Sequence, residues 1–376
     1  MIADATTSAD VRNAVSTARE HGLPVAVYAT GHGGPMPAAD DAVVITTAGM
    51  TGVFVDPGRR VARVGAGVRW GEVIAAAAPF GLAPLSGTSP DVGVVGYTLG
   101  GGMGWLSRRY GFAADSVLRA EIVTADGEPR TISADREPDL FWAIRGGGAN
   151  FGVVTALEFR LYPAGTVYAG TATFPLHLAA DVLAAYRDTD IPDELTANVV
   201  LTRESVAIRG MYAGPAEDAR RALAPLWLGE PVADGWRAMS YTESGTVGGT
   251  APHNFTLRHD VPVAAIVDAV HGGANTVEVR RWGGAMARPG ADAGPIGHRD
   301  VPFSVVVDGP AEVVAPVVAN GTGGSFLNWL HDPARTHTAY TAADYARLRE
   351  VKAAYDPDRV FTPVKSIPPV TCTVAA

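Results

Sequence analysis

The sequence predicts an α+β protein built from two parts and a C-terminal segment. Three observations support this fold class. Glycine-rich loops crowd the first 152 residues, each at the end of a predicted strand or helix. From about Ala164 these clusters thin out, and alternating strands are separated by alanine-rich helices, which is typical of an antiparallel sheet covered by helices. An amphipathic helix that stops at Asp356-Pro357 closes the chain.

The composition is that of a folded, soluble protein. The chain has 376 residues, of which 47% are hydrophobic and 18% charged, enough for two domains with a sizeable core. A net charge of −9 argues against nucleic acid or an anionic membrane as a partner. The single cysteine, Cys372, excludes an intramolecular disulfide and a thiolate metal cluster, and we expect no metal site. Without a secretory signal or an apolar run of ~20 residues, we expect a cytoplasmic monomer or homodimer.

The first part is predicted from local signals. Ser8 is the expected N-cap of a helix that Gly22 ends, and Asp56-Pro57-Gly58 and Asp126-Gly127 are the expected turns of two hairpins. The predicted strands and helices then follow in order: strands 23–29, 42–46 and 52–67, helix 70–80, hairpin 119–133, a short helix running into a glycine loop over 138–152, and strand 153–163.

The second part alternates between two periodicities. Period-two patterns predict strands, and patterns with a period near 3.6 predict helices. The expected elements are strands 196–203, 205–214, 276–284 and 301–309 and helices 180–188, 216–227 and 342–361.

Three glycine loops indicate the kind of ligand. They are TGHGGPMP (30–37), a long stretch over 85–111, and RGGGANFG (145–152). The central stretch is expected to be too irregular for a helix and too poor in side chains for a core strand. What glycine offers is close approach of the main chain, with bare N–H groups as donors. The loops therefore predict a large, flat, phosphorylated cofactor.

Two common nucleotide-binding arrangements do not fit these loops. The segment GAGVRWG (65–71) follows a strand and opens a helix, as a dinucleotide fingerprint should, but Trp70 stands where the third glycine is required. The acidic residue expected after the next strand is also absent, and so is a phosphate loop with its lysine. A nicotinamide-dependent dehydrogenase is therefore disfavoured.

The motifs resemble a known flavoprotein family. In order they read ATGHGG, VGAGVRWGEV, SGTSPDVGVVGYTLGGGMGWLSRRYGFAADSV, DLFWAIRGGGANFGVVTALEF and YDPDRVF…IPP. This series is similar to the berberine bridge enzyme-like flavoproteins of the vanillyl-alcohol oxidase/p-cresol methylhydroxylase (PCMH) superfamily, densely over 10–161 and more loosely over 325–369. The resemblance implies a PCMH-type FAD-binding domain of two subdomains (1–163), a substrate-binding domain with a large antiparallel sheet (164–330), and a C-terminal segment (331–376) that returns to the FAD domain.

The resemblance also implies how FAD is held. His32 matches the histidine that joins the 8α-methyl carbon of the flavin, whereas Ser89 stands where many relatives have a cysteine bonded to the 6-position. Single covalent attachment through His32 is therefore expected. Val92 matches a position where valine accompanies the reaction of reduced flavin with oxygen. The other implied cofactor-binding residues are Thr30, Gly31, Gly33, Gly34, Gly87, Thr88, Gly93, Gly96, Tyr97, Gly100, Gly101, Gly102, Gly104, Asn150, Gly152, Val153, Val154 and Asn328.

The catalytic residues are predicted from the chemistry and the strand pattern. Oxidation of an alcohol or amine by a flavin needs a base. Within 276–284, alternation places Val277 and Val279 on one face and Glu278 on the other, with Arg280 and Trp282. Glu278 is the candidate base, and the alternative is a solvated Glu–Arg pair on an outward face.

Several tyrosines are further catalytic candidates. Tyr241 and Tyr97 could reach the site, as could Tyr110. Phe326 stands where the family has a tyrosine, so a tyrosine base at that position is lost. The terminal polar triplet of the family is here Val-Lys-Ser (364–366).

Two functions of different kinds remain open at this stage. The first is an FAD-dependent oxidase that removes hydride from a C–O or C–N carbon of a small secondary-metabolite or sugar-like molecule, with O2 reoxidising the flavin. The second keeps the fold and FAD without net oxidation, as a redox-neutral cyclase or a catalytically silent FAD-binding protein.

Overall fold

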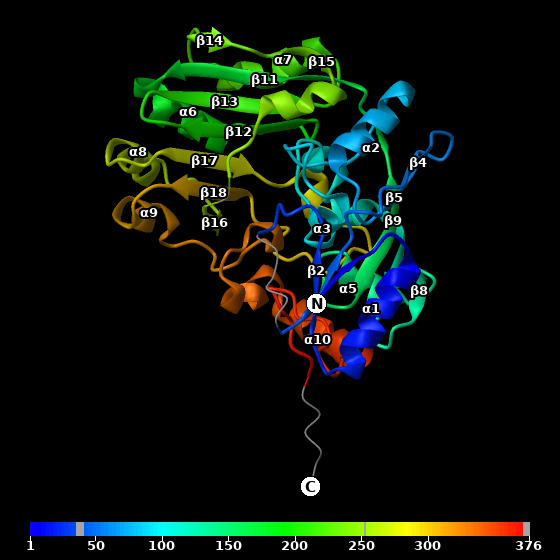
Figure 1. Ribbon diagram of the computed structural model, residues 1–376. Helices are drawn as coiled ribbons and strands as arrows, with labels where there is room; N and C mark the ends of the chain where they lie inside the picture. Colours follow the sequence, from blue (N-terminus) through cyan, green and yellow to red (C-terminus); the bar gives the residue numbers. More distant parts are fainter. Residues whose placement is uncertain (35–40, 252, 371–376) are drawn as a thin grey trace.

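The computed structural model describes residues 1–34, 41–251 and 253–370 and contains three main sheets (Figure 1). Two of them lie in the first part of the chain and the third in the second part (Figure 1). The α+β class and the covered antiparallel sheet predicted from the sequence are confirmed. Cys372 and residues 35–37 of the first glycine loop lie outside the described residues.

The first sheet is small and parallel. Its strands, in the order β1-β3-β2, are β1 (Ile2–Asp4), β3 (Val43–Thr46) and β2 (Val25–Tyr28), and helix α1 (Ser8–Glu20) packs on it. The N-cap of α1 is Thr7 rather than Ser8. The Thr7 side chain accepts a hydrogen bond from the Asp10 N–H (3.2 Å), and the Asp10 carboxylate accepts one from the Thr7 N–H (2.9 Å). These two reciprocal hydrogen bonds form a capping box that satisfies two backbone N–H groups at the helix start. Thr7 is therefore the N-cap, and Ser8 is the first residue of the helix.

The second sheet confirms both predicted hairpins. Its antiparallel order is β4-β5-β9-β7-β8. The strands and helices of this subdomain are β4 (Val53–Asp56), β5 (Val61–Gly65), α2 (Trp70–Ala77), β7 (Val117–Val123), β8 (Pro129–Ser133), α5 (Pro138–Ile144) and β9 (Val153–Arg160). Strands β6 (Leu82–Ala83) and β10 (Tyr162–Pro163) form a separate short pair.

The central glycine stretch is partly helical, so the prediction that it forms no helix is wrong. It contains α3 (Val94–Leu99) and the single turn α4 (Ser107–Tyr110). Helix α3 forms because its apolar side chains, such as Val94 and Leu99, are buried on one side, while Gly96 is exposed on the other. Tertiary burial therefore outweighs the low helix propensity of glycine here.

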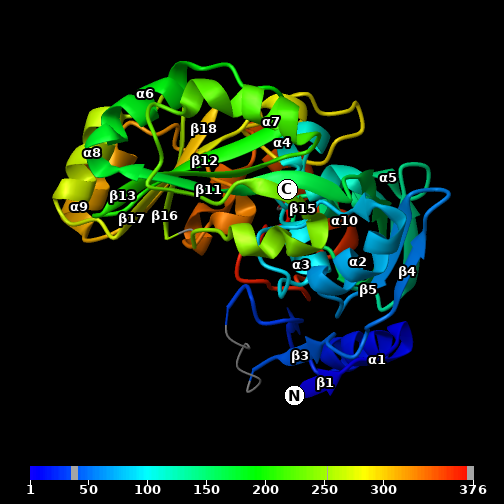
Figure 2. The same cartoon turned by 90° about the horizontal axis from the view of Figure 1, so that it is seen from above.

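The third sheet is large, antiparallel and covered on one face only. Its order is β14-β11-β13-β12-β17-β18-β16, with β15 also paired to β11. Helices α6, α7, α8 and α9 cover the outer face, and the opposite face is turned toward the first part of the chain (Figures 1 and 2). Its strands are β11 (Thr166–Pro175), β12 (Leu195–Leu201), β13 (Ser205–Tyr212), β14 (Ala233–Asp234), β15 (Arg237–Ser240), β16 (Asn254–Arg258), β17 (Thr276–Arg281) and β18 (Phe303–Asp308). The helices are α6 (Ala179–Asp188), α7 (Ala216–Leu223), α8 (Val263–His271) and α9 (Ala311–Val318).

The C-terminal segment packs with the first part of the chain. Helix α10 (Ala342–Tyr355) lies against α5 and ends at Asp356, as the sequence predicts (Figure 1). Leu348, Phe361 and Ile367 belong to the same buried core as the two smaller sheets. Within the described residues, no helix combines the length and the apolarity that crossing a membrane would need.

Candidate functional site

The His32 loop and the central glycine stretch lie against each other. The loop follows the end of β2, and Gly31 is in the left-handed region (φ +77°), where a Cβ would lie 2.4 Å from the Tyr28 hydroxyl. A Cβ on Gly93 would come within 3.0 Å of the Thr30 side chain. The His32 side chain is exposed beside this contact, as are Gly33 and Gly34. The structure thus brings together two loops that the sequence separates by about sixty positions.

Asn328 holds the glycine stretch from the other side. Its side-chain oxygen accepts a hydrogen bond from the Gly102 N–H (2.9 Å), and its amide donates to the Tyr97 carbonyl (3.1 Å). A Cβ on Gly100 would lie 2.5 Å from the Asn328 amide nitrogen, so glycine is required there. Asn328 therefore fixes the main chain of the predicted cofactor loop, more than two hundred residues away in sequence.

Phe326, two residues earlier, packs on the same stretch. A Cβ on Gly101 would meet the Phe326 ring at 2.9 Å. Phe326 also stacks on Phe112 and contacts Trp282 and Trp329 edge-on. This aromatic cluster lies between the large sheet and the glycine stretch.

Gly104 and Gly96 differ in the space around them. A Cβ on Gly104 would lie 1.9 Å from the Ser86 carbonyl oxygen, so the fold itself requires glycine. Nothing in the described chain lies within 4 Å of a Cβ placed on Gly96, which is exposed in helix α3. Glycine inside a helix costs about 1 kcal/mol relative to alanine. The open space over Gly96 fits close approach of a flat group that is not part of the chain, which is what FAD would supply.

The contrast between Gly96 and Gly104 predicts opposite effects of replacing each glycine by alanine. We expect Gly96→Ala to leave the thermal stability of the flavin-free protein equal or higher, because alanine favours a helix and meets no neighbour. We expect it to lower the flavin bound per protein, measured from the visible absorbance after purification. Gly104→Ala should instead destabilise the fold, by about 1–3 kcal/mol for an overpacked site. Unchanged flavin content in Gly96→Ala would remove this support for the cofactor position.

The 87–93 loop borders a cavity of about 360 Å³. Gly87, Thr88 and Pro90 line one side and residues 242–246 the other. Ser89 is half-buried in this loop, and Val92 is a partly buried residue packed against the core. The cavity lies between helix α2 and the segment that follows β15, at the boundary of the two parts of the chain.

Asn150 has a structural role that the sequence did not indicate. Its amide donates to the carbonyls of Gly147 (2.8 Å) and Lys365 (3.1 Å), and its oxygen accepts from the Ile367 N–H (2.8 Å). Both amide hydrogens are thus used within the chain. Asn150 ties the C-terminal segment to the third glycine loop, which explains its burial without a cofactor contact.

Its neighbours Gly152, Val153 and Val154 are also explained by the fold. A Cβ on Gly152 would lie 2.5 Å from the Val123 carbonyl oxygen, and the two valines are buried in β9. The described structure therefore gives these three predicted cofactor residues packing roles.

The environment of Glu278 does not favour a base. The residue is fully buried on the face of β17 that is turned toward the glycine stretch, so a solvated outward pair is wrong. Its carboxylate accepts hydrogen bonds from Asn198 (2.7 Å), Arg209 (3.1 Å) and Arg280 (3.0 Å). Burial raises the pKa of Glu278, but the charges of Arg280 and Arg209 outweigh it and hold the pKa at about 2. A carboxylate with so low a pKa takes up a proton poorly at neutral pH.

The tyrosines fall into two groups. The Tyr241 hydroxyl shares a hydrogen bond with the Ser86 hydroxyl (2.8 Å) and donates to the Pro84 carbonyl (3.2 Å), so it supports the fold. Burial raises its pKa to about 12. Tyr110 stacks on Tyr162, with ring centroids 4.2 Å apart.

Tyr97 differs because its hydroxyl is buried with no hydrogen-bond partner among the described residues. Burial raises its pKa well above 10, while the charge of Arg280 acts in the opposite direction. The hydroxyl lies 3.3 Å from a Cβ placed on Gly104, within the glycine stretch. Because it is the one of these three hydroxyls that is buried without a partner in the described structure, Tyr97 is the strongest of the predicted catalytic candidates.

Two polar features of the site were missed from the sequence. Arg209, Asn198 and Arg280 are directly opposite one another on β13, β12 and β17. The strand alternation of 196–203 and 205–214 could have placed each residue on the inner face, but not in one row. Lys365 donates to the Leu327 carbonyl (2.5 Å) beside Asn328, and burial lowers its pKa to about 8.

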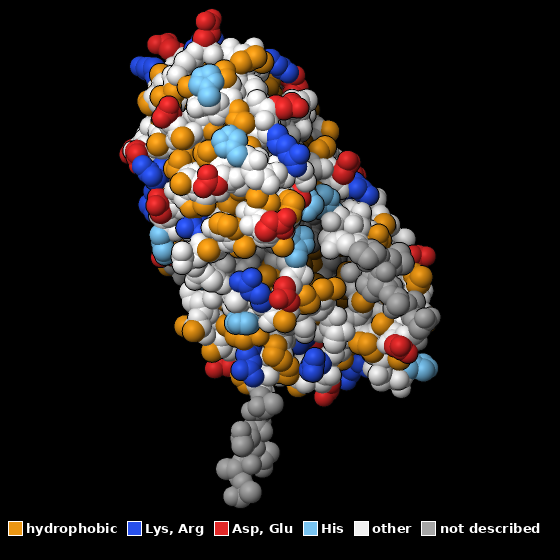
Figure 3. All heavy atoms as spheres, turned by 90° about the vertical axis from the view of Figure 1, so that its left-hand side faces the viewer, with side chains coloured by type: hydrophobic (Ala, Val, Ile, Leu, Met, Phe, Trp, Pro, Cys, Tyr) orange, Lys and Arg blue, Asp and Glu red, His pale blue; other side chains and the backbone are white. Residues whose placement is uncertain are grey.

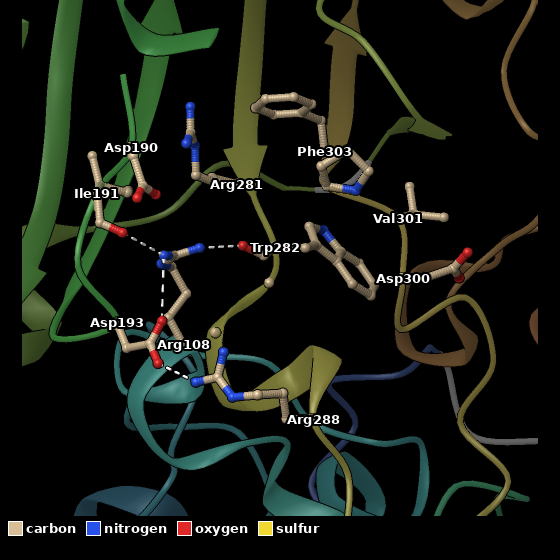
Figure 4. A pocket seen from close by; sticks show the side chains of 13 residues that line it. Arg108, Asp190, Ile191, Asp193, Arg281, Trp282, Arg288, Asp300, Val301 and Phe303 are labelled. Atoms are coloured by element: carbon tan, nitrogen blue, oxygen red, sulfur yellow. Dashed lines mark hydrogen bonds and ion pairs between the residues drawn. The ribbon is translucent and has the colours of Figure 1, made fainter. Parts of the chain in front are cut away.

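A second cavity, of about 300 Å³, lies at the end of β17 (Figure 4). Arg108 points into it and donates to the carbonyls of Leu195 (2.9 Å), Ile191 (3.0 Å) and Trp282. Asp193 lies between Arg108 and Arg288 (Figure 4). Because its hydrogen bonds end on backbone carbonyls, Arg108 joins α4 to the large sheet.

The face of the molecule shown in Figure 3 carries charges of both signs. On the face shown in Figure 3, acidic and basic side chains are interspersed rather than gathered by sign. No cluster of three or more potential metal ligands occurs among the described residues.

Comparisons with known proteins agree with this architecture. Residues 1–133 match the family described as "FAD binding domain", and residues 325–368 match "Berberine and berberine like". The first match covers the first two glycine loops, and the second covers the segment that carries Asn328 and Lys365.

Among curated proteins, the chain is 30% identical to (R)-6-hydroxynicotine oxidase of Paenarthrobacter nicotinovorans, over 96% of this chain and 89% of that protein. Among solved structures it resembles BBE-like 1 of Physcomitrella patens (TM-score 0.87, 21% identity, 98% of this chain and 91% of the other). It also resembles a glucooligosaccharide oxidase of Acremonium strictum with 6-S-cysteinyl, 8α-N1-histidyl FAD (TM-score 0.83, 24% identity, 98% and 92%). With its glycine loops, its one-sided antiparallel sheet and its returning C-terminal segment, the chain belongs to the berberine bridge enzyme-like family of FAD-linked oxidoreductases.

Proposed function

We propose that this oxidoreductase is an oxidase that removes hydride from a C–O or C–N carbon of a small organic substrate, with O2 as the final electron acceptor. The observation that carries the proposal is a convergence of loops. The His32 loop, the central glycine stretch and Asn328 meet on the side of the large sheet opposite helices α6, α7, α8 and α9.

The residues present fit FAD attached through His32. The imidazole is exposed in the glycine loop whose Thr30 contacts Gly93, and it would hold the flavin there by a covalent bond. Ser89 lies in the neighbouring loop, where a serine hydroxyl is too weak a nucleophile for a second bond without an activating base. Bound FAD would supply a two-electron acceptor next to the sheet.

The chain's own residues would bind and orient the substrate. Trp329 is partly exposed, with the buried rings of Phe326 and Trp282 packed behind it, and the Arg280 guanidinium lies over the Trp329 ring as a polar contact. The names of the relatives support an oxidase: one oxidises (R)-6-hydroxynicotine and another glucooligosaccharides.

Val92 gives the test of oxidase activity. We expect flavin that has been photoreduced without air to reoxidise within seconds on mixing with air, followed by its visible absorbance. The Val92→Leu variant should reoxidise at least about tenfold more slowly, because a longer side chain restricts access of oxygen to the ring, and a factor of ten corresponds to about 1.4 kcal/mol of barrier. Reoxidation of the unmodified protein over many minutes would count against an oxidase. Hydrogen peroxide production over a panel of alcohols, amines and sugars then identifies substrates.

The second candidate function, a reaction without net oxidation, is favoured by the replacement of the expected base. Phe326 stands in the place of a family tyrosine, and Glu278 is a weak base, so neither of these two positions supplies a good proton acceptor. Rapid reoxidation together with product formation that consumes no oxygen would indicate this second function.

A further inference from the structure

A row of polar residues crosses the inner face of the large sheet. Asn198 on β12 lies opposite Arg209 on β13 and opposite Arg280 on β17. Their strand neighbours Ile208, Val199 and Val279 belong to the core under the helices, so the row faces the other way, toward the glycine stretch. This placement puts two guanidinium groups on a surface that otherwise packs against the first part of the chain.

The row carries an uncompensated positive charge. Glu278 is the only carboxylate within ion-pair distance of Arg209 or Arg280 among the described residues. The side chains of both arginines are nearly nine-tenths buried, and that of Glu278 is fully buried. Two cations and one anion leave a net charge of +1, which is costly to hold away from water.

The row also has open hydrogen-bonding positions. The Nε–H groups of Arg209 and Arg280 and the side-chain oxygen of Asn198 are buried and have no partner among the described residues. The Tyr97 hydroxyl is also buried without a hydrogen-bond partner among the described residues. Buried polar atoms are rarely left unpaired, so this concentration points to a ligand.

The open positions lie beside the predicted cofactor loops. The Arg280 guanidinium lies over the Trp329 ring, 4.5 Å from its centroid, and Trp329 contacts Phe326, which packs on Gly101. Thr250 accepts hydrogen bonds from Arg209 through its hydroxyl (2.9 Å) and from Arg280 through its carbonyl (2.9 Å). The adjacent Gly249 packs on Thr88 of the 87–93 loop. The row is therefore flanked by flavin-loop residues on both sides.

We propose that the substrate is a monoanionic organic acid that carries a hydroxyl or amine group next to its carboxylate. The carboxylate binds the free Nε–H groups of Arg209 and Arg280. Its single negative charge balances the net charge of +1 on the row, whereas a phosphate dianion would leave a net charge of −1. The hydroxyl or amine, which is the group to be oxidised, donates to the Asn198 oxygen. The ring of Trp329 faces the organic part. This inference rests on the proposed function for the position of the reacting carbon.

Binding of simple acids to the FAD-loaded protein tests the inference when it is measured without air, so that no oxygen sustains turnover. The probes are mandelate, an aromatic hydroxy acid, and its neutral methyl ester, with lactate and methyl lactate as a smaller pair. We expect calorimetry to show the acid binding at least about tenfold more tightly than its ester in one or both pairs, the size of one charge-assisted hydrogen bond. Phenylacetate, which lacks the hydroxyl, should bind more weakly than mandelate.

Variants assign the preference to the row. Arg280→Gln should remove the preference for the acid, and Arg280→Lys should retain part of it because the charge remains. Arg209→Gln gives a second, independent variant should Arg280→Gln fail to fold. Arg203→Gln is the matched control, since Arg203 is exposed at the turn between β12 and β13, and should change nothing.

Several outcomes would overturn the inference. Equal binding of acid and ester in both pairs, or an acid preference that survives in Arg280→Gln, means that the row does not bind a carboxylate. A shift of flavin reduction potential in Arg280→Gln with an unchanged acid preference would assign the charge to the flavin instead. Acid binding by a protein that never reoxidises with air would support the inference while contradicting the proposed oxidase, so the two failures are distinguishable.

Discussion

The protein with His32 replaced by alanine will lose its flavin on acid precipitation, whereas the unmodified protein will keep it. We expect a yellow pellet from the unmodified protein and a colourless pellet under a yellow supernatant from His32→Ala. The physical reason is that a covalent bond survives unfolding and non-covalent contacts do not. His32 is the nucleophile exposed at the glycine loop that contacts Gly93, and Ser89 is too weak to replace it.

The control for this experiment is His177→Ala, which removes an exposed histidine from the substrate-binding part. It should give a yellow pellet, like the unmodified protein. A colourless pellet from the unmodified protein would exclude covalent attachment. A yellow pellet from His32→Ala would show that another residue forms the bond.

The second large effect concerns a buried ion pair at the end of α10. The Lys352 ammonium donates to the Asp356 carboxylate (2.5 Å) and to the carbonyls of Asn150 (2.6 Å) and Phe361 (3.0 Å). Asp356 in turn accepts from the N–H groups of Val360 (2.7 Å) and Phe361 (3.0 Å). Both side chains are fully buried, so removing one partner leaves the other charge without compensation.

We therefore expect Asp356→Ala to lower the free energy of unfolding by about 3–5 kcal/mol. Urea unfolding followed by tryptophan fluorescence measures this loss. Asp358→Ala, two residues away and exposed, should change stability by less than about 0.5 kcal/mol. The double variant Lys352→Met with Asp356→Ala should recover part of the loss because the isolated charge is gone. Equal stability of Asp356→Ala and Asp358→Ala would show that the pair does not hold the C-terminal segment in place.

Local signals predicted much of the fold because they act over a few residues. The Asp-Pro-Gly and Asp-Gly turns produced the hairpins β4-β5 and β7-β8, and Asp356-Pro357 ended α10 where expected. Helix α3 was missed because its stability comes from burying Val94 and Leu99, which a glycine-rich sequence does not reveal.

The sequence by itself determined the family, because its glycine motifs stand in the family's order, and it predicted the loops that would hold FAD. Only the tertiary structure decided which of these glycines the fold itself requires and which leave space, as Gly104 and Gly96 show. It also decided that Glu278 is buried in ion pairs with Arg209 and Arg280, and that Arg209, Asn198 and Arg280 form one row. Strand register brings those residues together across three strands, and register depends on long-range pairing that no local pattern contains.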